Sequence, residues 1–99
     1  MNEFEKITQQ DRRLVLLKLL TQDADYACNE YILREAIKPF GHKLSSDLLR
    51  SELNWLGEQG LLVVTDVSGV VVAKLTQRGK DVAEGCVAVP GVKRPEPEF

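Results

Sequence analysis

The sequence has little of what most catalytic and metal sites need. His42 is its single histidine, and Cys28 and Cys86 are its two cysteines. No pair among these three residues has the short spacing that chelation favours. The chain also lacks a glycine-rich phosphate loop and a nucleophile with a base motif beside it. These absences predict that the protein is not an enzyme and that it holds no metal or other cofactor.

Long apolar runs and an excess of positive charge are missing as well. No apolar stretch approaches the roughly 20 residues that cross a bilayer, and the polar, acidic segment 1–6 is unlike a secretory signal. A cytoplasmic protein with free thiols is therefore expected. The net charge of −2 supplies no general attraction for nucleic acid. Any DNA binding must then depend on where the basic residues lie.

What the chain does contain is a pattern of three helices. Its 99 residues, 43% of them hydrophobic, suffice for one domain. The first helix is predicted over 8–22, with Thr8 as its cap, and its leucines surround nearly the whole helix. Such a helix is buried on more than one side, against a second copy of the chain or against the protein's own tail. The residues predicted to form the contact of a homodimer are Leu16, Leu19 and Leu20.

Capping residues mark the next two helices. The second is predicted over 28–40, where Gly41 can end it. Ser45 is a good N-cap for the third, which continues to about Gln59 and ends at Gly60. Within the third helix, one face carries leucines and the opposite face is polar.

After Gly60 the period of the apolar residues changes from helical to alternating. Two β-branched runs, 61–65 and 70–75, flank a turn at 66–69, which predicts a β-hairpin. Thr76 then caps a short helix over 77–84. The remainder holds three of the four prolines and is predicted as an extended tail. The expected organisation is a domain over 1–85 followed by a tail over 86–99.

This order predicts a mostly helical α+β fold, a winged helix-turn-helix. Residues 53–62 (LNWLGEQGLL) resemble the Leu-x-x-Leu-x-x-x-Gly-Leu junction between the recognition helix and the wing in bacterial regulators. Residues 75–79 (LTQRG) resemble the Leu-Thr-x-x-Gly that follows the wing in the same proteins. Residues 82–85 and 89–95 resemble a family of small ArsR-like winged-helix proteins of Mu-like phages and prophages. The resemblance implies a phage origin and a bacterial host cytoplasm. It does not fix a function, because winged helices bind both DNA and proteins.

On the DNA hypothesis the third helix enters the major groove and its exposed side chains meet the base edges. The candidates for base contact are Arg50, Ser51 and Asn54. The candidates for phosphate contact lie just before or at the start of this helix. They are Lys38, His42, Lys43, Ser45 and Ser46. The same residues equally describe the solvated side of an amphipathic helix.

Three features oppose DNA binding, and they keep a second hypothesis open. Asp47 and Glu58 would repel phosphates unless they pair with Arg50, the turn at 66–69 has no cation, and the net charge is negative. The first hypothesis is a homodimeric DNA-binding transcriptional regulator of a phage or prophage. The alternative is a protein-interaction module in a phage or host assembly. It would use the apolar surplus of the first helix, the flank of Leu48 and Trp55, or the tail, although core packing on the second helix is the simpler interpretation of Trp55.

Overall fold

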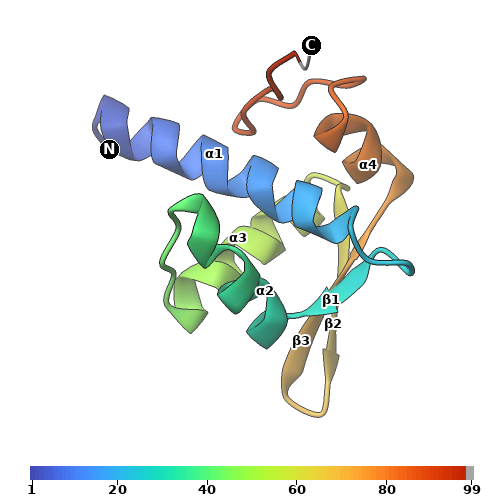
Figure 1. Cartoon of the computed structure of the whole chain (residues 1–99). Coiled ribbons are helices and arrows are strands. Elements are labelled where there is room, and N and C mark those ends of the chain that lie inside the picture. The colour runs from blue at the N-terminus through green and yellow to red at the C-terminus, as the bar shows by residue number, and fades with distance from the viewer. Residues whose placement is uncertain (98–99) are drawn as a thin grey trace.

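The computed structural model describes residues 1–97 and shows an α+β arrangement of helices around one antiparallel sheet (Figure 1). Over these residues there are four α-helices, one 3₁₀-helix and three strands. In chain order they are α1 (Glu3–Leu20), β1 (Ala27–Asn29), α2 (Glu30–Ala36), the 3₁₀-helix η1 (Lys38–Phe40), α3 (Ser46–Glu58), β2 (Leu62–Val67), β3 (Val70–Leu75) and α4 (Gln77–Ala83). No helix in this part of the chain combines the length and apolar composition that a bilayer crossing requires.

The first helix begins one and a half turns earlier than the sequence predicted. Asn2, not Thr8, is its N-cap, and the Asn2 side-chain oxygen accepts a hydrogen bond from the Glu5 amide at 2.8 Å. Thr8 lies inside the helix, where its hydroxyl donates to the Phe4 carbonyl. The first turns were missed because their apolar side chains, Phe4 and Ile7, are exposed and do not continue the buried leucine pattern.

The leucines of α1 are covered within a single chain. Leu16 and Leu20 have no exposed surface, and α1 packs on α2, α4 and β3. The prediction that these two residues contact a second copy is therefore wrong, because they belong to the core of one copy. Leu19 is half-buried. Part of the cover comes from residues 86–97, where Val89 and Val92 join the buried cluster and the Lys93 amide donates to the Gln10 carbonyl.

Strand β1 was not predicted, and it replaces the first turn expected of the second helix. It pairs antiparallel with β3, so the sheet has the order β1-β3-β2. Asn29 ends the strand and caps α2, since its side chain accepts a hydrogen bond from the Ile32 amide at 3.0 Å. The helix then tightens into η1, which contains Pro39, and ends at Gly41 with a φ of 89°.

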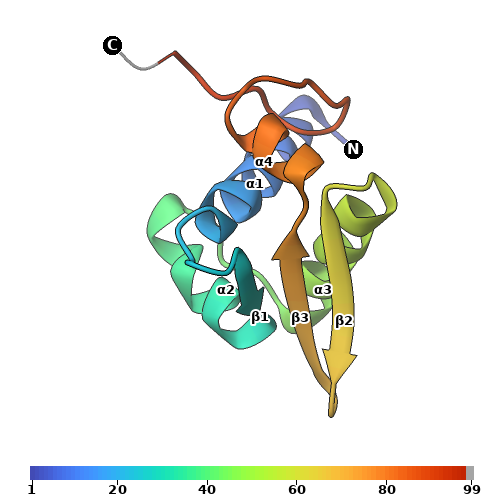
Figure 2. The same ribbon diagram turned by 90° about the vertical axis from the view of Figure 1, so that its right-hand side faces the viewer.

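Strands β2 and β3 form a hairpin that extends away from the helices (Figure 2). Its two turn residues, Ser68 and Gly69, both have positive φ, as a tight two-residue hairpin turn requires. At the other end of the hairpin Thr76 caps α4, because its hydroxyl accepts from the Gly79 amide. The Thr76 amide also donates to the Leu61 carbonyl, which joins α4 to the start of β2.

We expect Gly79→Ala to destabilise the fold by about 2–3 kcal/mol, the usual cost of overpacking a close contact. A Cβ at this position would collide with the Leu61 carbonyl oxygen and lie 2.7 Å from Leu75 Cδ1. Gly57→Ala is the matched control, because its Cβ meets a movable Val64 methyl at 3.3 Å and lies at ordinary contact distance, 3.7 Å, from the Leu62 carbonyl oxygen. Urea unfolding should show a change of at most about 1 kcal/mol for the control. Equal midpoints for the two variants would contradict this account of Gly79.

Candidate nucleic-acid interface

Helix α3 buries one face and presents a polar face to solvent. Ser45 caps it, since its hydroxyl accepts from the Leu48 amide at 3.1 Å. The inward side chains of Leu49, Leu53 and Leu56 are buried. The exposed polar side chains recur at helical spacing along the opposite face. They are Asp47, Ser51, Asn54 and Glu58.

A buried carboxylate sets the orientation of this helix. Glu52, on α3, is 2% exposed, and its two oxygens accept from Arg12 Nε at 2.7 Å and Arg13 Nε at 3.1 Å. The Arg13 guanidinium lies 3.7 Å from the centre of the Trp55 ring and also donates to the Gly91 carbonyl. These contacts join α3 to α1 and to the tail. They also place Trp55 under Arg13, partly buried against the core.

Arg50, predicted to contact bases, is paired within the protein, although 43% of its side-chain surface is exposed. Its Nε and Nη2 donate to the two oxygens of Glu30 at 2.7 and 2.8 Å, and Nη2 also reaches the Gly69 carbonyl at 3.2 Å. Glu30 in turn accepts from the Val71 amide at 2.6 Å. Arg50 therefore ties α2, α3 and the hairpin together. Arg50 pairs with neither Asp47 nor Glu58, so it does not offset the repulsion of phosphates by these two carboxylates.

This pairing changes the acid–base behaviour of both groups. The hydrogen bonds from Arg50, and then from the Val71 amide, lower the pKa of Glu30 below its ordinary value. The hydrogen bond and charge of Glu30 raise the pKa of Arg50. The pair is charged at neutral pH, so using Arg50 for base contact would leave the nearly buried Glu30 carboxylate without its main partner.

The predicted phosphate contacts do not all reach the surface. His42 is 6% exposed, and its Nε2 lies 2.7 Å from Asp11 Oδ2 on α1, so its assignment to phosphate is wrong. Lys43 is exposed in the loop that leads into α3. Lys38 is also exposed, although it forms an ion pair with Glu35 at 2.9 Å.

The two serines at the start of α3 already have partners in the protein. Ser45 uses its hydroxyl as the cap, and Ser46 Oγ accepts from Arg34 Nη1 at 3.2 Å. The exposed candidates that remain on or next to α3 are Lys38, Lys43, Ser51 and Asn54. Over residues 1–97, no three His, Cys, Asp or Glu side chains come together as metal ligands would.

Comparison with known proteins places the chain in a phage-associated family. It is 46% identical to gp26 of Escherichia phage Mu over 91 residues, which cover 92% of this chain and 94% of gp26. It is 43% identical to a protein of Haemophilus influenzae strain Rd over 76 residues, or 76% of this chain and 74% of that protein. Both relatives are described as uncharacterized. No protein-family model matches the sequence.

We expect the charge on Glu30 to contribute stability that acid removes. Because the pKa is lowered in the folded state, this contribution is complete above the ordinary value of about 4.3 and is lost as the pH falls through the folded value. Glu30→Gln should therefore lower Tm by several degrees at pH 7, and the gap from the parent protein should narrow between pH 5 and pH 3. Glu35→Gln, at an exposed ion pair, is the control and should change Tm little. A Tm difference between Glu30→Gln and the parent protein that stays constant with pH would contradict a stabilising role for the Glu30 charge.

Proposed function

The chain belongs to the same family as gp26 of phage Mu, and we propose that it is a winged-helix protein that binds double-stranded DNA as a phage or prophage transcriptional regulator. In this proposal α2 and α3 form the helix-turn-helix, α3 is the recognition helix and the β2–β3 hairpin is the wing. The order α1-β1-α2-α3-β2-β3, with β1 paired to β3 at the base of the hairpin, supports that assignment.

The observation that carries the proposal is a pair of unengaged polar side chains on α3. Ser51 and Asn54 are exposed, and neither side chain makes a hydrogen bond within residues 1–97. The contacts of Glu52 with Arg12 and Arg13 fix α3 to α1 on its buried side. The two exposed groups therefore lie on a helix whose position is fixed. An Asn amide can make two hydrogen bonds to an adenine edge, and a Ser hydroxyl can bind several base edges.

Phosphate binding would depend on few cations. Lys43 precedes α3 directly, and Lys38 lies on η1. Two phosphate contacts per copy imply a slope of log affinity against log salt of about −1.8, or roughly a 12-fold loss of affinity between 50 and 200 mM salt. The exposed carboxylates of Asp47 and Glu58 oppose close approach of phosphates, so affinity without base contacts should be low.

We expect Lys43→Ala and Asn54→Ala to affect DNA binding differently. Lys43→Ala should weaken binding to all duplexes alike and reduce the magnitude of the salt slope by about one for each bound copy. Asn54→Ala should leave the slope unchanged and reduce the preference for a selected site by about 1–3 kcal/mol. Fluorescence anisotropy of labelled duplexes at several salt concentrations measures both effects. Lys80→Ala, which removes a lysine from α4, is the matched control for Lys43→Ala.

The same titration can overturn the proposal. Absence of binding at 50 mM salt, or binding that does not weaken as salt rises, would exclude a phosphate-based interface. The protein-interaction module would then become the better hypothesis, with a protein pull-down as its test. Equal effects of Lys80→Ala and Lys43→Ala would show that α3 and its preceding loop are not the DNA-binding surface.

A further inference from the structure

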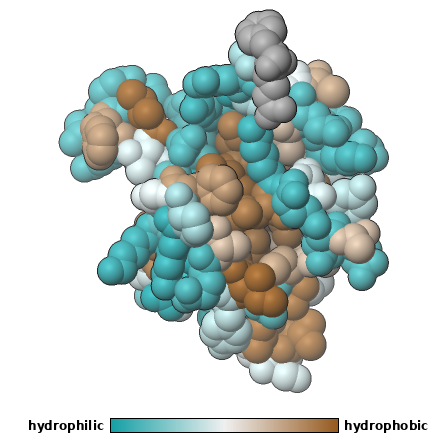
Figure 3. All heavy atoms as spheres, in the orientation of Figure 1, coloured by the Kyte–Doolittle hydropathy of each residue, from teal (hydrophilic) through white to brown (hydrophobic). Residues whose placement is uncertain are grey.

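The N-terminal end of α1 carries apolar side chains that nothing in the described chain covers. Met1 is 80% exposed, Phe4 77% and Ile7 57%. The helix is about 27 Å long, and its first turns extend beyond the other elements (Figure 1). Hydrophobic atoms are visible at this protruding end (Figure 3). We call Met1, Phe4 and Ile7 the tip.

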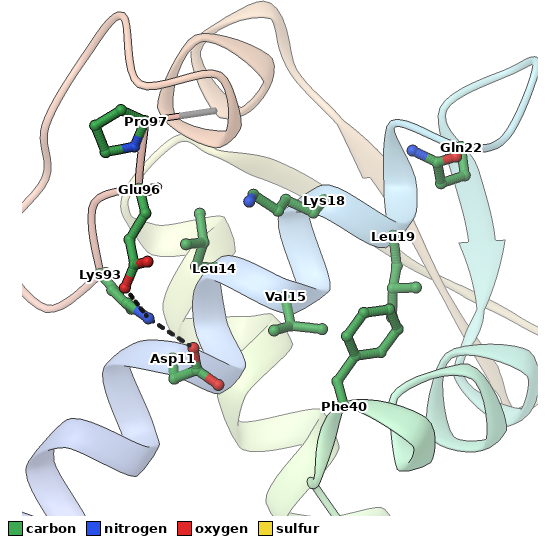
Figure 4. Close-up of a pocket in the computed structure, with 10 residues that line it drawn as sticks. All are labelled: Asp11, Leu14, Val15, Lys18, Leu19, Gln22, Phe40, Lys93, Glu96 and Pro97. Atoms are coloured by element: carbon green, nitrogen blue, oxygen red, sulfur yellow. Dashed lines mark hydrogen bonds and ion pairs between the residues drawn. The ribbon is translucent and has the colours of Figure 1, made fainter. Parts of the chain in front are cut away.

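A second uncovered apolar surface lies along the other half of the same helix. Leu14, Val15 and Leu19 line a groove whose side is formed by Phe40 of η1 (Figure 4). The charged residues at its edges are Asp11, Lys18, Lys93 and Glu96. Phe40 is 57% exposed, so the groove is open to solvent. We call Val15, Leu19 and Phe40 the α1 groove. Brown atoms at the centre of Figure 3 show an apolar area on the same side of the molecule.

The tip and the α1 groove are on one face of the helix. At 100° per residue, the directions of Phe4, Ile7, Val15 and Leu19 fall within about 120° of one another. A flat contact along this face would therefore cover both surfaces together. Because they lie at opposite ends of one helix, two copies in antiparallel orientation bring each tip to the groove of the other. This is the self-complementary arrangement that a two-fold axis produces.

From this placement we propose that the chain forms a homodimer in which the tip of each copy fills the α1 groove of the other. A two-fold axis near Asp11 places Phe4 beside the partner's Leu19 and Ile7 beside the partner's Val15. The dimer does not depend on DNA binding.

Charge favours the same antiparallel pairing. Glu3 and Glu5 lie at the tip, whereas Lys18 lies at the edge of the groove, so the pairing brings opposite charges together. The two copies of Asp11 would meet near the axis. In each copy Lys93 Nζ lies 3.5 Å from one Asp11 oxygen and His42 Nε2 lies 2.7 Å from the other, which limits their repulsion.

Sedimentation equilibrium over a range of protein concentrations tests the dimer. The unaltered chain should show a reversible monomer–dimer equilibrium. Ile7→Lys should weaken it by about 100-fold, because each dimer contains the change twice. Ile32→Lys is the matched control, since Ile32 on α2 is 58% exposed and lines no part of the groove. A purely monomeric chain, or equal weakening by the two variants, would overturn the proposal.

A mixing experiment tests the contact of tip with groove directly. Phe40→Glu should weaken the dimer as Ile7→Lys does. When the two variants are mixed, one contact of the mixed dimer is unaltered and the other places Lys at position 7 beside Glu at position 40. The mixture should therefore associate more tightly than either variant alone. A mixture that associates no better than its components would refute the tip-in-groove arrangement, even if the chain dimerises.

Discussion

The buried carboxylate of Glu52 is the contact on which the arrangement of this protein depends. A charge among leucines is stable only with close partners, and Arg12 and Arg13 supply them from α1. Arg13 extends the contact to Trp55 and to the carbonyl of Gly91. The rotation of α3 about its own axis is fixed in this way. That rotation decides which of its side chains face solvent.

A second carboxylate, Glu30, completes the support of α3 from the side of the hairpin. It holds Arg50, and the two residues together contact the backbone of Gly69 and Val71. The contacts of Glu52 and Glu30 together use three arginines to join elements of the protein to one another. They are Arg12, Arg13 and Arg50. The outward face of α3 is consequently poor in free cations. DNA binding by this face would rely on neutral hydrogen-bonding groups and a few lysines, and a dimer would double the phosphate contacts of each complex.

The proposed dimer and the proposed DNA interface use different α-helices and share only η1, which carries Phe40 for the first and Lys38 for the second. The first uses one face of α1 with Phe40, and the second uses the outward face of α3 with Lys43. The core between them is formed by the leucines of α1 and α3. In the proposed dimer the leucine-rich helix α1 therefore has two functions. Its inner faces build the core of one copy, and its remaining face, with the exposed tip, contacts a second copy.

Local features of the chain were readable from residue order alone. The caps Ser45 and Thr76, the ending at Gly41 and the paired strands around Ser68 and Gly69 each depend on a few consecutive residues, so short motifs predict them. Exposure of Ser51 and Asn54 followed from helical periodicity in the same way.

Contacts between distant residues were beyond that kind of reasoning. Arg50 meets Glu30 across 20 positions, His42 meets Asp11 across 31, and the three-residue strand β1 exists because β3 is there to pair with it. Whether Leu16 faces a core or a partner depends likewise on what packs over it. Residue order thus determines where helices, turns and caps form, because those interactions are local. Packing assigns each charged or apolar side chain to the interior or the surface, because burial and ion pairing depend on neighbours far away in the chain.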